Sequence, residues 1–341
     1  MQAELRNVIW LVTAACNMRC MHCYVARWRG RLAELGPAAR LRLASEMVEA
    51  GVEWVGITGG EPLLLPDFWR IAGLLSGAGV EVTVNTNALL VDEGVAEKLS
   101  RVVSRVYVSI DGSRETHEAM RRCRGCHRRV LEAVRLLTRA GVDVVPVMAV
   151  SRINYRAVDE YLETVAELGL ETAALIPVMP QGEARLTGIW PDAETYNTAV
   201  LRAAVRAKDL GLRLHLWCTP YAHALRLPGN VFYGNCRLSP TIDIDPAGNI
   251  LLCDVIDVVL SNAAEKGLVK AAEEAAAHPL TRAIENPELS GACRECPYRG
   301  RCMGGCYARS LLVYGALNAG DPLCPLLGSK DKAPRDIDYH G

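Results

Sequence analysis

The sequence predicts an α/β protein: a partial (β/α)6 barrel followed by a loop-rich C-terminal domain that carries most of the cysteines. From Asn7 to about Ile176, short β-branched runs alternate with helix-length segments. Six such units in succession favour a parallel sheet covered by outer helices, and six are too few for a complete eightfold barrel. Eight of the 13 cysteines lie at or after Cys218, where the chain becomes rich in loops.

Each predicted strand is a short apolar run that begins or ends near a glycine. The runs are Val8–Val12, Val52–Ile57, Val80–Val84, Val106–Ile110, Val142–Val147 and Thr172–Ile176. Apolar residues at helical spacing predict two buried helix faces, Val130, Val134 and Leu137 on one and Val158, Leu162, Val165 and Leu168 on the other.

The pattern changes after Pro177, which is followed by a loop and by a helix predicted from Asp192 to Lys208. We expect a domain boundary between about residues 210 and 230. The predicted division is a barrel domain of residues 1–210 and a cysteine-rich domain of residues 211–341.

Composition excludes several classes of protein. The net charge of −1 gives no field suited to nucleic acid or an acidic membrane surface. No apolar run is long enough to span a membrane, and residues 1–6 lack a signal-peptide pattern, so we expect a cytoplasmic protein. In that compartment, 13 cysteines indicate metal ligands rather than disulfides.

Three cysteines near the N-terminus carry the most information. Cys16, Cys20 and Cys23 form a C-x3-C-x2-C triad directly after the first predicted strand. Such a loop can hold three corners of a 4Fe–4S cube and leave the fourth iron open to a substrate. A structural zinc site needs four ligands, whereas this run offers three cysteines and His22. The remaining alternative is three unrelated buried thiols.

On this triad the chain resembles the radical S-adenosylmethionine (radical SAM) superfamily. The resemblance implies a partial (β/α)6 barrel, with the cluster loop at the C-terminal ends of the strands. It also implies that S-adenosylmethionine binds the open iron and that one electron from the cluster breaks its C5′–S bond. The product is a 5′-deoxyadenosyl radical that abstracts hydrogen from an unactivated carbon.

The segment Thr58-Gly59-Gly60-Glu61-Pro62 follows the second predicted strand. Two glycines let the backbone approach a ligand closely, and their N–H groups, together with Glu61, suit an amine or carboxylate. The family resemblance implies that Gly59, Gly60, Glu61 and Pro62 contact the aminoacyl end of S-adenosylmethionine. The alternative is a plain β-turn.

Polar residues also end the third and fourth predicted strands. Asn85 and Asn87 follow one strand, and Ser109 and Asp111 follow the next. The resemblance implies contacts from these positions to the ribose, the carboxylate or the substrate; alternatively, Asp111 caps the following helix. Tyr24, directly after Cys23, is expected either near the adenine or in the core.

A basic loop at 121–129 contains Cys123 and Cys126 as a C-x2-C pair. One interpretation is a solvated helix start closed by a disulfide. The other is an arginine clamp for a substrate carboxylate or phosphate.

The C-terminal cysteines follow a second pattern. Residues 241–253 are predicted to form a β-hairpin with Pro246, Gly248 and Asn249 at its turn. The remaining cysteines and this hairpin fit C-x(9–15)-G-x4-C, then C-x2-C-x5-C-x3-C, then a last cysteine. The chain here resembles the SPASM subclass of radical SAM enzymes. A zinc ribbon of Cys293 and Cys296 with Cys302 and Cys306 is the alternative.

This second resemblance implies two auxiliary 4Fe–4S clusters, and therefore three clusters in all. Cys236, Cys253 and Cys306 would hold the first, and Cys293, Cys296, Cys302 and Cys324 the second. Two fully ligated clusters need one more thiolate, for which Cys218 is the candidate. Its alternative is a buried thiol beside Trp217.

Three functions remain open at this stage. The first is a maturase that crosslinks or oxidises a peptide or protein, and the second is tetrapyrrole or metal-cofactor biosynthesis. The third is a non-enzymatic electron carrier, against which the Gly59–Pro62 segment argues. We expect a low-potential donor of the ferredoxin or flavodoxin type and no nucleic-acid or membrane partner. Because only 15 residues precede Cys16, no fused leader-binding domain is expected.

The sequence does not identify a general base. The titratable residues in or near the linking region are Glu183, Asp192, His215, Tyr221 and His223, and their spacing selects none of them.

Overall fold

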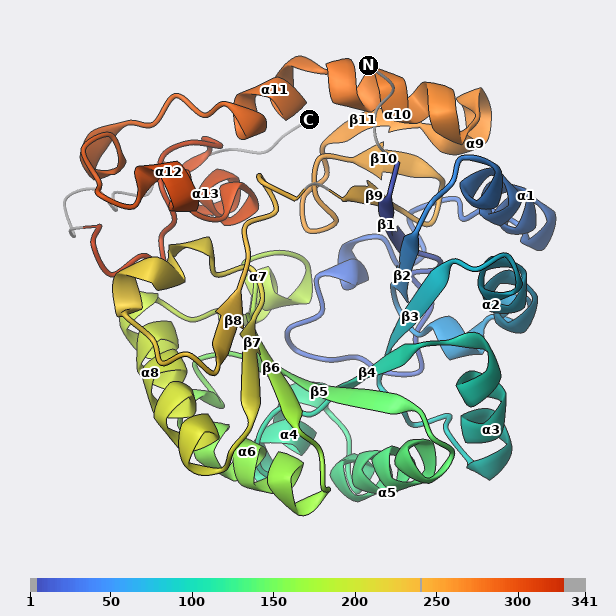
Figure 1. The fold of residues 1–341 in the computed structure, drawn as a ribbon, viewed down its shortest axis with the longest axis horizontal. Helices are drawn as coiled ribbons and strands as arrows, with labels where there is room; N and C mark the ends of the chain where they lie inside the picture. The colour runs from blue at the N-terminus through green and yellow to red at the C-terminus, as the bar shows by residue number, and fades with distance from the viewer. Residues whose placement is uncertain (1–4, 240, 328–341) are drawn as a thin grey trace.

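Eleven strands form one continuous sheet in the computed structural model, which describes residues 5–239 and 241–327 (Figure 1). The strands are β1 (Asn7–Leu11), β2 (Trp54–Thr58), β3 (Glu81–Thr86), β4 (Arg105–Ser109), β5 (Asp143–Val150), β6 (Thr172–Pro177), β7 (Arg213–Leu216), β8 (Val231–Tyr233), β9 (Ile242–Ile244), β10 (Asn249–Leu251) and β11 (Val259–Asn262). Their order in the sheet is β11-β10-β9-β1-β2-β3-β4-β5-β6-β7-β8. The sheet curves into an open ring, with β11 and β8 at its two ends.

Parallel pairing runs without interruption from β1 to β8. The predicted α/β partial barrel is therefore confirmed, and the six predicted strands correspond to β1–β6 within a few residues. Strands β7 and β8 were not predicted, because four-residue and three-residue strands give too short an apolar pattern to stand out. Both strands lie beyond residue 210 and extend the barrel sheet. The division into domains of residues 1–210 and 211–341 stays a prediction.

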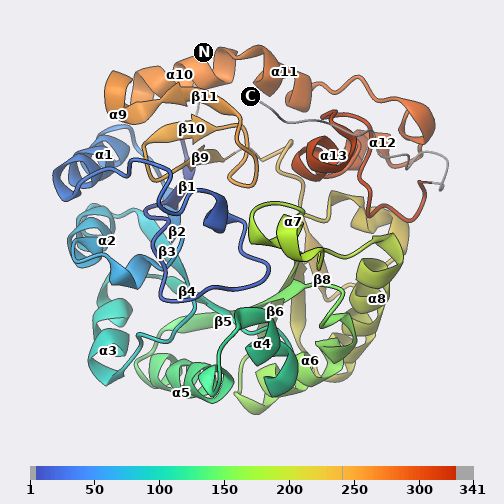
Figure 2. The same cartoon turned by 180° about the vertical axis from the view of Figure 1, so that it is seen from behind.

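Most of the helices cover the outside of the ring, whereas α7 lies inside it (Figures 1 and 2). They are α1 (Pro37–Glu49), α2 (Phe68–Gly77), α3 (Glu93–Val102), α4 (Arg114–Arg121), α5 (Cys126–Arg139), α6 (Val158–Glu167), α7 (Glu183–Thr187), α8 (Ala193–Asp209), α9 (Ala263–Lys266), α10 (Leu268–Ala277), α11 (Pro279–Glu285), α12 (Arg299–Cys302) and α13 (Tyr307–Tyr314). Short 3₁₀ helices occur at Val25–Arg27, Pro62–Leu64, Tyr155–Ala157, Pro220–Leu225 and Gly291–Cys293.

The predicted helix faces are buried as the apolar spacing requires. On α5, Val130, Val134 and Leu137 are buried in the main core. On α6, Val158, Leu162 and Val165 are buried, and Leu168 packs half-buried against the same core just after the helix ends. The predicted helix from Asp192 corresponds to α8, for which the Asp192 carboxylate accepts a hydrogen bond from Thr195 N–H at 2.9 Å.

The C-terminal segment returns to the first strand. Strand β9 pairs in parallel with β1, Val8 standing opposite Ile242, and β10 pairs antiparallel with β9. The predicted hairpin is thus confirmed. Its turn depends on Gly248, whose φ of 84° lies in the left-handed region that favours glycine.

Because β1–β4 are parallel, the segments that follow them emerge at the same edge of the sheet. These segments carry the cysteine triad, Gly59–Pro62, Asn87 and Asp111. The segment after β1 runs across the centre of the ring, with α7 beside it (Figure 2). The fold therefore brings together the residues that were expected to bind a cofactor.

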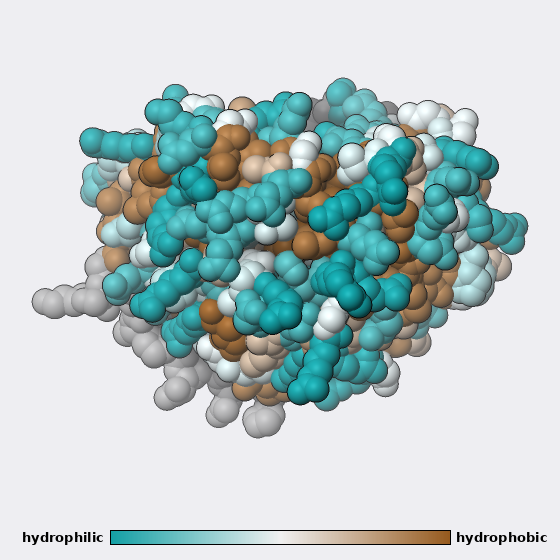
Figure 3. Space-filling view, turned by 90° about the horizontal axis from the view of Figure 1, so that it is seen from below, coloured by the Kyte–Doolittle hydropathy of each residue, from teal (hydrophilic) through white to brown (hydrophobic). Residues whose placement is uncertain are grey.

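Hydrophilic and hydrophobic residues are interspersed on the face shown in Figure 3. Within residues 5–239 and 241–327, no helix has both the length and the apolar character needed to cross a bilayer.

Tyr161 on α6 connects the helix layer to the sheet. Its hydroxyl lies 2.7 Å from the carbonyl oxygen of Pro146 on β5 and accepts a hydrogen bond from Ala174 N–H on β6 at 3.3 Å.

Tyr161→Phe removes these bonds from a fully buried site, which costs about 1 kcal/mol. We expect an apparent melting temperature about 2 °C lower in anaerobic unfolding scans. Tyr155→Phe is the matched control, because the Tyr155 hydroxyl bonds only the exposed Arg156 in the described structure; an equal shift in both variants would contradict this role.

Candidate functional site

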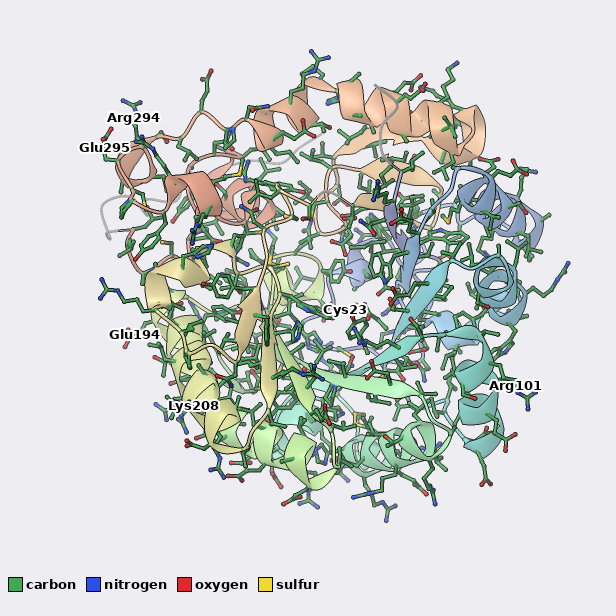
Figure 4. The ribbon with its side chains drawn as sticks, viewed as in Figure 1. Cys23, Arg101, Glu194, Lys208, Arg294 and Glu295 are labelled. Carbon is green, nitrogen blue, oxygen red and sulfur yellow. A yellow bond between two sulfur atoms is a disulfide. The ribbon has the colours of Figure 1, made fainter. Side chains whose placement is uncertain are left out.

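The predicted cluster cysteines lie together on the segment after β1. Cys23 is near the centre of the ring, whereas Arg101, Glu194 and Lys208 point outward from the outer helices (Figure 4). Cys20 is buried, and Cys16 and Cys23 are half-buried. The three thiols interact electrostatically with one another.

The surroundings of these sulfurs fit thiolates bound to iron. Met18 N–H donates to Cys16 Sγ at 3.4 Å, and the guanidinium of Arg121 lies 4.0 Å from Cys20 Sγ. Burial raises the pKa of Cys20 to about 11, although Arg121 lowers it. Burial thus disfavours the free thiolate of Cys20, a bound metal centre would stabilise it, and the N–H donors suit the sulfur of such a centre. The donor set of three thiols is what a 4Fe–4S cluster with one open iron uses.

Backbone hydrogen bonds join the Gly59–Pro62 segment to the cysteine segment. Gly60 N–H donates to Thr13 O at 2.6 Å, and Glu61 N–H donates to Ala15 O at 2.8 Å. A Cβ atom on Gly59 or Gly60 would overlap the carbonyl oxygen of Thr13 or Ala15. The glycines were expected to admit a ligand; the structure shows that they also admit the cysteine segment itself.

Glu61 is fully buried and its carboxylate is occupied by this chain. It accepts hydrogen bonds from Thr86 Oγ1 at 2.8 Å, Asn87 N–H at 2.8 Å and Leu63 N–H at 3.2 Å. Burial raises the pKa of Glu61 to about 7, although these bonds lower it. Glu61 thus joins the segment after β2 to the end of β3, and its contact with a cofactor stays a prediction.

The two asparagines extend this network. Asn87 Nδ2 donates to Asn17 Oδ1 at 2.7 Å and lies 3.9 Å from Cys16 Sγ, which places its side chain against the cysteine segment. Asn85 is half-buried and donates to Thr58 Oγ1 at 3.3 Å.

Asp111 does not cap the following helix, so that alternative was wrong. The N-cap of α4 is Ser113, whose side chain accepts from Thr116 N–H. Asp111 instead forms a buried ion pair with Arg121, 2.7 Å from Nε to Oδ2, and accepts from Ala149 N–H at 2.9 Å. Burial raises the pKa of Asp111, but the Arg121 guanidinium and nearby histidines outweigh it and hold the pKa below its usual value. Sequence reasoning did not single out Arg121 within its run of arginines.

The remaining predicted cofactor residues lie around this centre. Ser109 ends β4 and is half-buried, and Pro62 is the first residue of a 3₁₀ helix. Tyr24 reaches toward the C-terminal region, where its hydroxyl donates to Asp254 Oδ2 at 2.7 Å. Their contacts with S-adenosylmethionine stay predictions.

Three C-terminal cysteines gather around Cys306, which is buried at the N-cap of α13. The thiol of Cys306 interacts electrostatically with those of Cys218, Cys236 and Cys253. Burial is the largest cause of the raised pKa of each of these thiols. Cys218 and Cys236 are nevertheless reached by solvent.

The buried Arg309 contacts two members of this first group of cysteines, which consists of Cys218, Cys236, Cys253 and Cys306. Arg309 N–H donates to Cys306 Sγ at 3.5 Å, and Arg309 Nη2 donates to the carbonyl oxygen of Cys218 at 2.8 Å. The guanidinium pairs with Asp321 at 2.6 Å, and both side chains are almost fully buried. Cys218 has a φ of 51°, an uncommon value for a non-glycine residue that points to constraint at this position.

The second group consists of Cys293, Cys296, Cys302 and Cys324. Cys302 and Cys324 are buried, and each interacts electrostatically with Cys293 and Cys296. Thiolates around one zinc ion lie about 3.8 Å apart. Among residues 5–239 and 241–327, three or more ligand atoms come within 4.8 Å of one another only in His117/Cys123/Cys126 and Asp243/Cys253/Asp254. Within the described residues, no three thiols of the predicted zinc ribbon lie this close together. Cys306 also belongs to the first group, so the zinc-ribbon alternative is not favoured.

Cys123 and Cys126 form a disulfide between α4 and α5. The two arginines directly before it form ion pairs, Arg121 with Asp111 and Arg122 with Glu183 at 2.8 Å. Arg129 Nη2 donates to the carbonyl oxygen of Leu89 at 3.2 Å. These bonds involve three of the five arginines of the loop, whereas Arg124 and Arg128 are exposed, so the arginine clamp for substrate stays a prediction.

The five titratable residues that sequence reasoning left open have separate structural surroundings. Glu183 pairs with Arg122, and Asp192 caps α8. The ring of His215 stacks on Phe232, that of His223 meets Tyr233 edge-on, and Tyr221 is buried.

The close approach at Gly60 generates a test. Gly60→Ala places a methyl group against the carbonyl of Ala15, so the cysteine segment must shift. We expect the reconstituted variant to lose about four irons and its S-adenosylmethionine cleavage, measured by iron analysis and by release of 5′-deoxyadenosine. Gly73→Ala in α2 is the control, since nothing lies within 4 Å of its added carbon. Full iron content and activity in Gly60→Ala would show that this close backbone approach does not position the cysteine segment.

Comparisons with known proteins agree with this site. Residues 10–165 match the model of the Radical SAM superfamily. AdoMet-dependent heme synthase of Methanosarcina barkeri is 26% identical over 344 residues, covering 94% of this chain and 96% of the relative. Mycofactocin maturase MftC of Mycobacterium tuberculosis is 27% identical over 350 residues, covering 96% and 86%.

A solved structure shares the fold. Native anSMEcpe with bound AdoMet and Cp18Cys peptide matches with a TM-score of 0.69 at 15% identity, covering 88% of each chain. The family match brings with it a 4Fe–4S cluster and S-adenosylmethionine, which the cysteine segment fits. The chain is therefore an enzyme with a radical SAM domain at residues 10–165, and its later cysteines follow the pattern of the SPASM subclass.

Proposed function

We propose that this enzyme matures a peptide or protein substrate by hydrogen abstraction, forming a crosslink or an oxidised side chain. When bound, the reduced cluster supplies one electron to S-adenosylmethionine and so provides the 5′-deoxyadenosyl radical. Support comes from the likeness to mycofactocin maturase over 96% of the chain. The shared fold with anSMEcpe, whose structure holds AdoMet and a peptide, agrees with it.

The choice between a peptide and a tetrapyrrole substrate rests on whether the arginines of the basic loop are free to bind propionate groups. A tetrapyrrole with propionate groups would need free cations at the mouth of the barrel. Arg121 and Arg122, the first two arginines of the basic loop, are held in ion pairs with Asp111 and Glu183. The barrel interior instead presents an aromatic contact, Tyr107 against Trp217 at 5.0 Å between ring centroids. Tyr107 lies on β4 and Trp217 directly follows β7; since these strands are not neighbours in the sheet, the contact spans the interior and offers an apolar surface to a substrate side chain.

The residues of this chain would hold the cofactor as follows. Cys16, Cys20 and Cys23 bind the cluster, and the segment Gly59–Pro62 meets the aminoacyl end of S-adenosylmethionine. Asn85, Asn87, Ser109, Asp111 and Tyr24 line the rest of the nucleotide site. Asp111 acts with Arg121 as one neutral pair, because their charges compensate in a buried position.

We further propose two auxiliary 4Fe–4S clusters. Cys218, Cys236, Cys253 and Cys306 would hold the first, and Cys293, Cys296, Cys302 and Cys324 the second. The electrostatic grouping of the thiols and the support of Cys218 by Arg309 favour this assignment. Electrons would come from a low-potential ferredoxin-type or flavodoxin-type donor in the cytoplasm.

Cys218→Ala tests the first auxiliary cluster. Removing one of four thiolates should lower the iron content by up to about four atoms and change the Mössbauer spectrum of the remainder. The control is the double variant Cys123→Ala/Cys126→Ala, which leaves all proposed ligands in place and should keep full iron. Full iron and an unchanged spectrum in Cys218→Ala would show that Cys218 is not a ligand.

The triple variant Cys16→Ala/Cys20→Ala/Cys23→Ala tests the radical centre. We expect no 5′-deoxyadenosine from the reduced protein, while about two thirds of the iron stays with the auxiliary groups. Chromatography of the nucleoside and iron analysis measure both. Retained cleavage of S-adenosylmethionine would refute the assignment.

The substrate class is tested with the wild-type protein, anaerobically reconstituted and reduced. Short peptides encoded beside its gene, and an iron porphyrin with propionate groups, are each incubated with enzyme and S-adenosylmethionine. We expect a peptide to lose a pair of hydrogens in step with 5′-deoxyadenosine release, as seen by mass spectrometry. Loss of carbon dioxide from the porphyrin, with the peptides unchanged, would overturn the proposal.

A further inference from the structure

The Cys123–Cys126 disulfide lies against the radical centre, although neither family pattern includes it. Cys126 is buried in a small cluster with Met18 and Cys20, and Cys123 is half-exposed at its edge. Arg121, which holds Asp111 and approaches Cys20, precedes Cys123 by two positions. The disulfide therefore fixes the segment that carries Arg121.

His117 on α4 completes the surroundings of the two sulfurs. A ring nitrogen of His117 and both sulfurs lie within 4.8 Å of one another. Nδ1 accepts a hydrogen bond from Asp111 N–H at 3.1 Å, so the ring proton of the neutral imidazole is on Nε2. His117 is fully buried, and within the described residues its Nε2 has no hydrogen-bond partner.

This arrangement does not suit a metal ion. A metal needs a free lone pair on the ring, but that of Nδ1 receives Asp111 N–H and Nε2 carries the proton. It does suit a reduced sulfur. A thiol or thiolate of this group is a better acceptor than a disulfide for the buried Nε2–H, which has no partner among the described residues.

The start of α5 favours the same reduced sulfur. Cys126 is the first residue of this 14-residue helix, and its N-cap, Gly125, provides no side chain to the N–H groups of the first turn. The N-terminus of a helix stabilises negative charge and promotes thiol–disulfide exchange at such a cysteine.

We propose that Cys123–Cys126 is a reversible thiol–disulfide couple that exchanges with an external dithiol and controls how firmly Arg121 is held at the S-adenosylmethionine site. A thiolate of the dithiol attacks Sγ of Cys123, the less buried of the two cysteines, the S–S bond breaks, and Cys126 leaves as the thiolate beside His117 and the α5 N-terminus. The second thiol of the reductant then displaces Cys123. Two electrons pass to the pair, which takes up two protons, and the reductant becomes a disulfide.

The couple is tested on the reconstituted holoenzyme without any peptide substrate, so the result is independent of the proposed function. The protein is equilibrated anaerobically with defined ratios of reduced and oxidised dithiothreitol. Free thiols are then alkylated, and the peptides carrying Cys123 and Cys126 are quantified by mass spectrometry. We expect both cysteines to pass together from unmodified to alkylated while the native fold is kept. A pair that is alkylated only after denaturation would overturn the proposal.

His117→Asn tests the hydrogen bond. Asparagine keeps a polar atom near Asp111 N–H but removes the Nε2 donor, so half-reduction should need a roughly tenfold higher ratio of dithiol to disulfide, about 30 mV for two electrons. The matched control is His127→Asn, whose ring lies 5.3 Å from that of His117 but outside the group of three. Equal midpoints for wild type and His117→Asn would remove His117 from the couple. Stoichiometric zinc on the reduced pair would show a metal site instead.

The link to Arg121 is tested by binding of S-adenosylmethionine to the holoenzyme with its clusters oxidised, so that no cleavage occurs. Reduction of the pair should weaken binding at least about fivefold in equilibrium dialysis, because the segment after Arg121 is no longer fastened to α5. The double variant Cys123→Ser/Cys126→Ser should bind like the reduced wild type and should not respond to dithiothreitol. Equal affinity in both redox states of the wild type would refute control through Arg121.

Discussion

The site depends on two backbone hydrogen bonds between segments that follow neighbouring strands. Gly60 and Glu61 donate to the carbonyl oxygens of Thr13 and Ala15, one residue on each side of Ala14. Because β1 and β2 pair in parallel and in register up to their last residues, the two segments leave the sheet side by side. The bonds need an approach that only glycine permits, so the cysteine segment takes its position from the sheet rather than from its own sequence.

Charge at this centre is balanced within the protein before any cofactor is considered. Asp111 and Arg121 are both buried and paired, and Arg121 also faces the sulfur of Cys20. A buried charge without a partner would cost several kcal/mol, whereas the pair leaves a dipole with its positive end toward the sulfur. This orientation suits the negative charge that three thiolates bring to a cluster. A second buried pair, Arg309 with Asp321, stands beside Cys306 in the C-terminal region and repeats the arrangement.

The sequence was sufficient for elements whose signal is local. The six strands, the buried faces of α5 and α6 and the β9–β10 hairpin each follow from residue spacing within one segment. It was insufficient for contacts between distant segments. The ion pair of Asp111 was not predicted because its partner, Arg121, is one of several arginines in a run, and only the packing of α4 selects it. The pairing of β9 with β1 joins residues more than two hundred positions apart, which no local pattern encodes.

That pairing gives the two cysteine-rich regions a common frame. Strand β9 lies beside β1, so the hairpin that leads to Cys253 begins next to the strand that leads to Cys16. The connection is reinforced where Tyr24 donates to Asp254 and Arg27 pairs with Asp257 at 2.7 Å. Residues directly after Cys23 and directly after Cys253 are thus bonded to each other. Any movement of one cysteine group relative to the other would have to break these bonds together with the β1–β9 pairing, so the sheet itself fixes their separation.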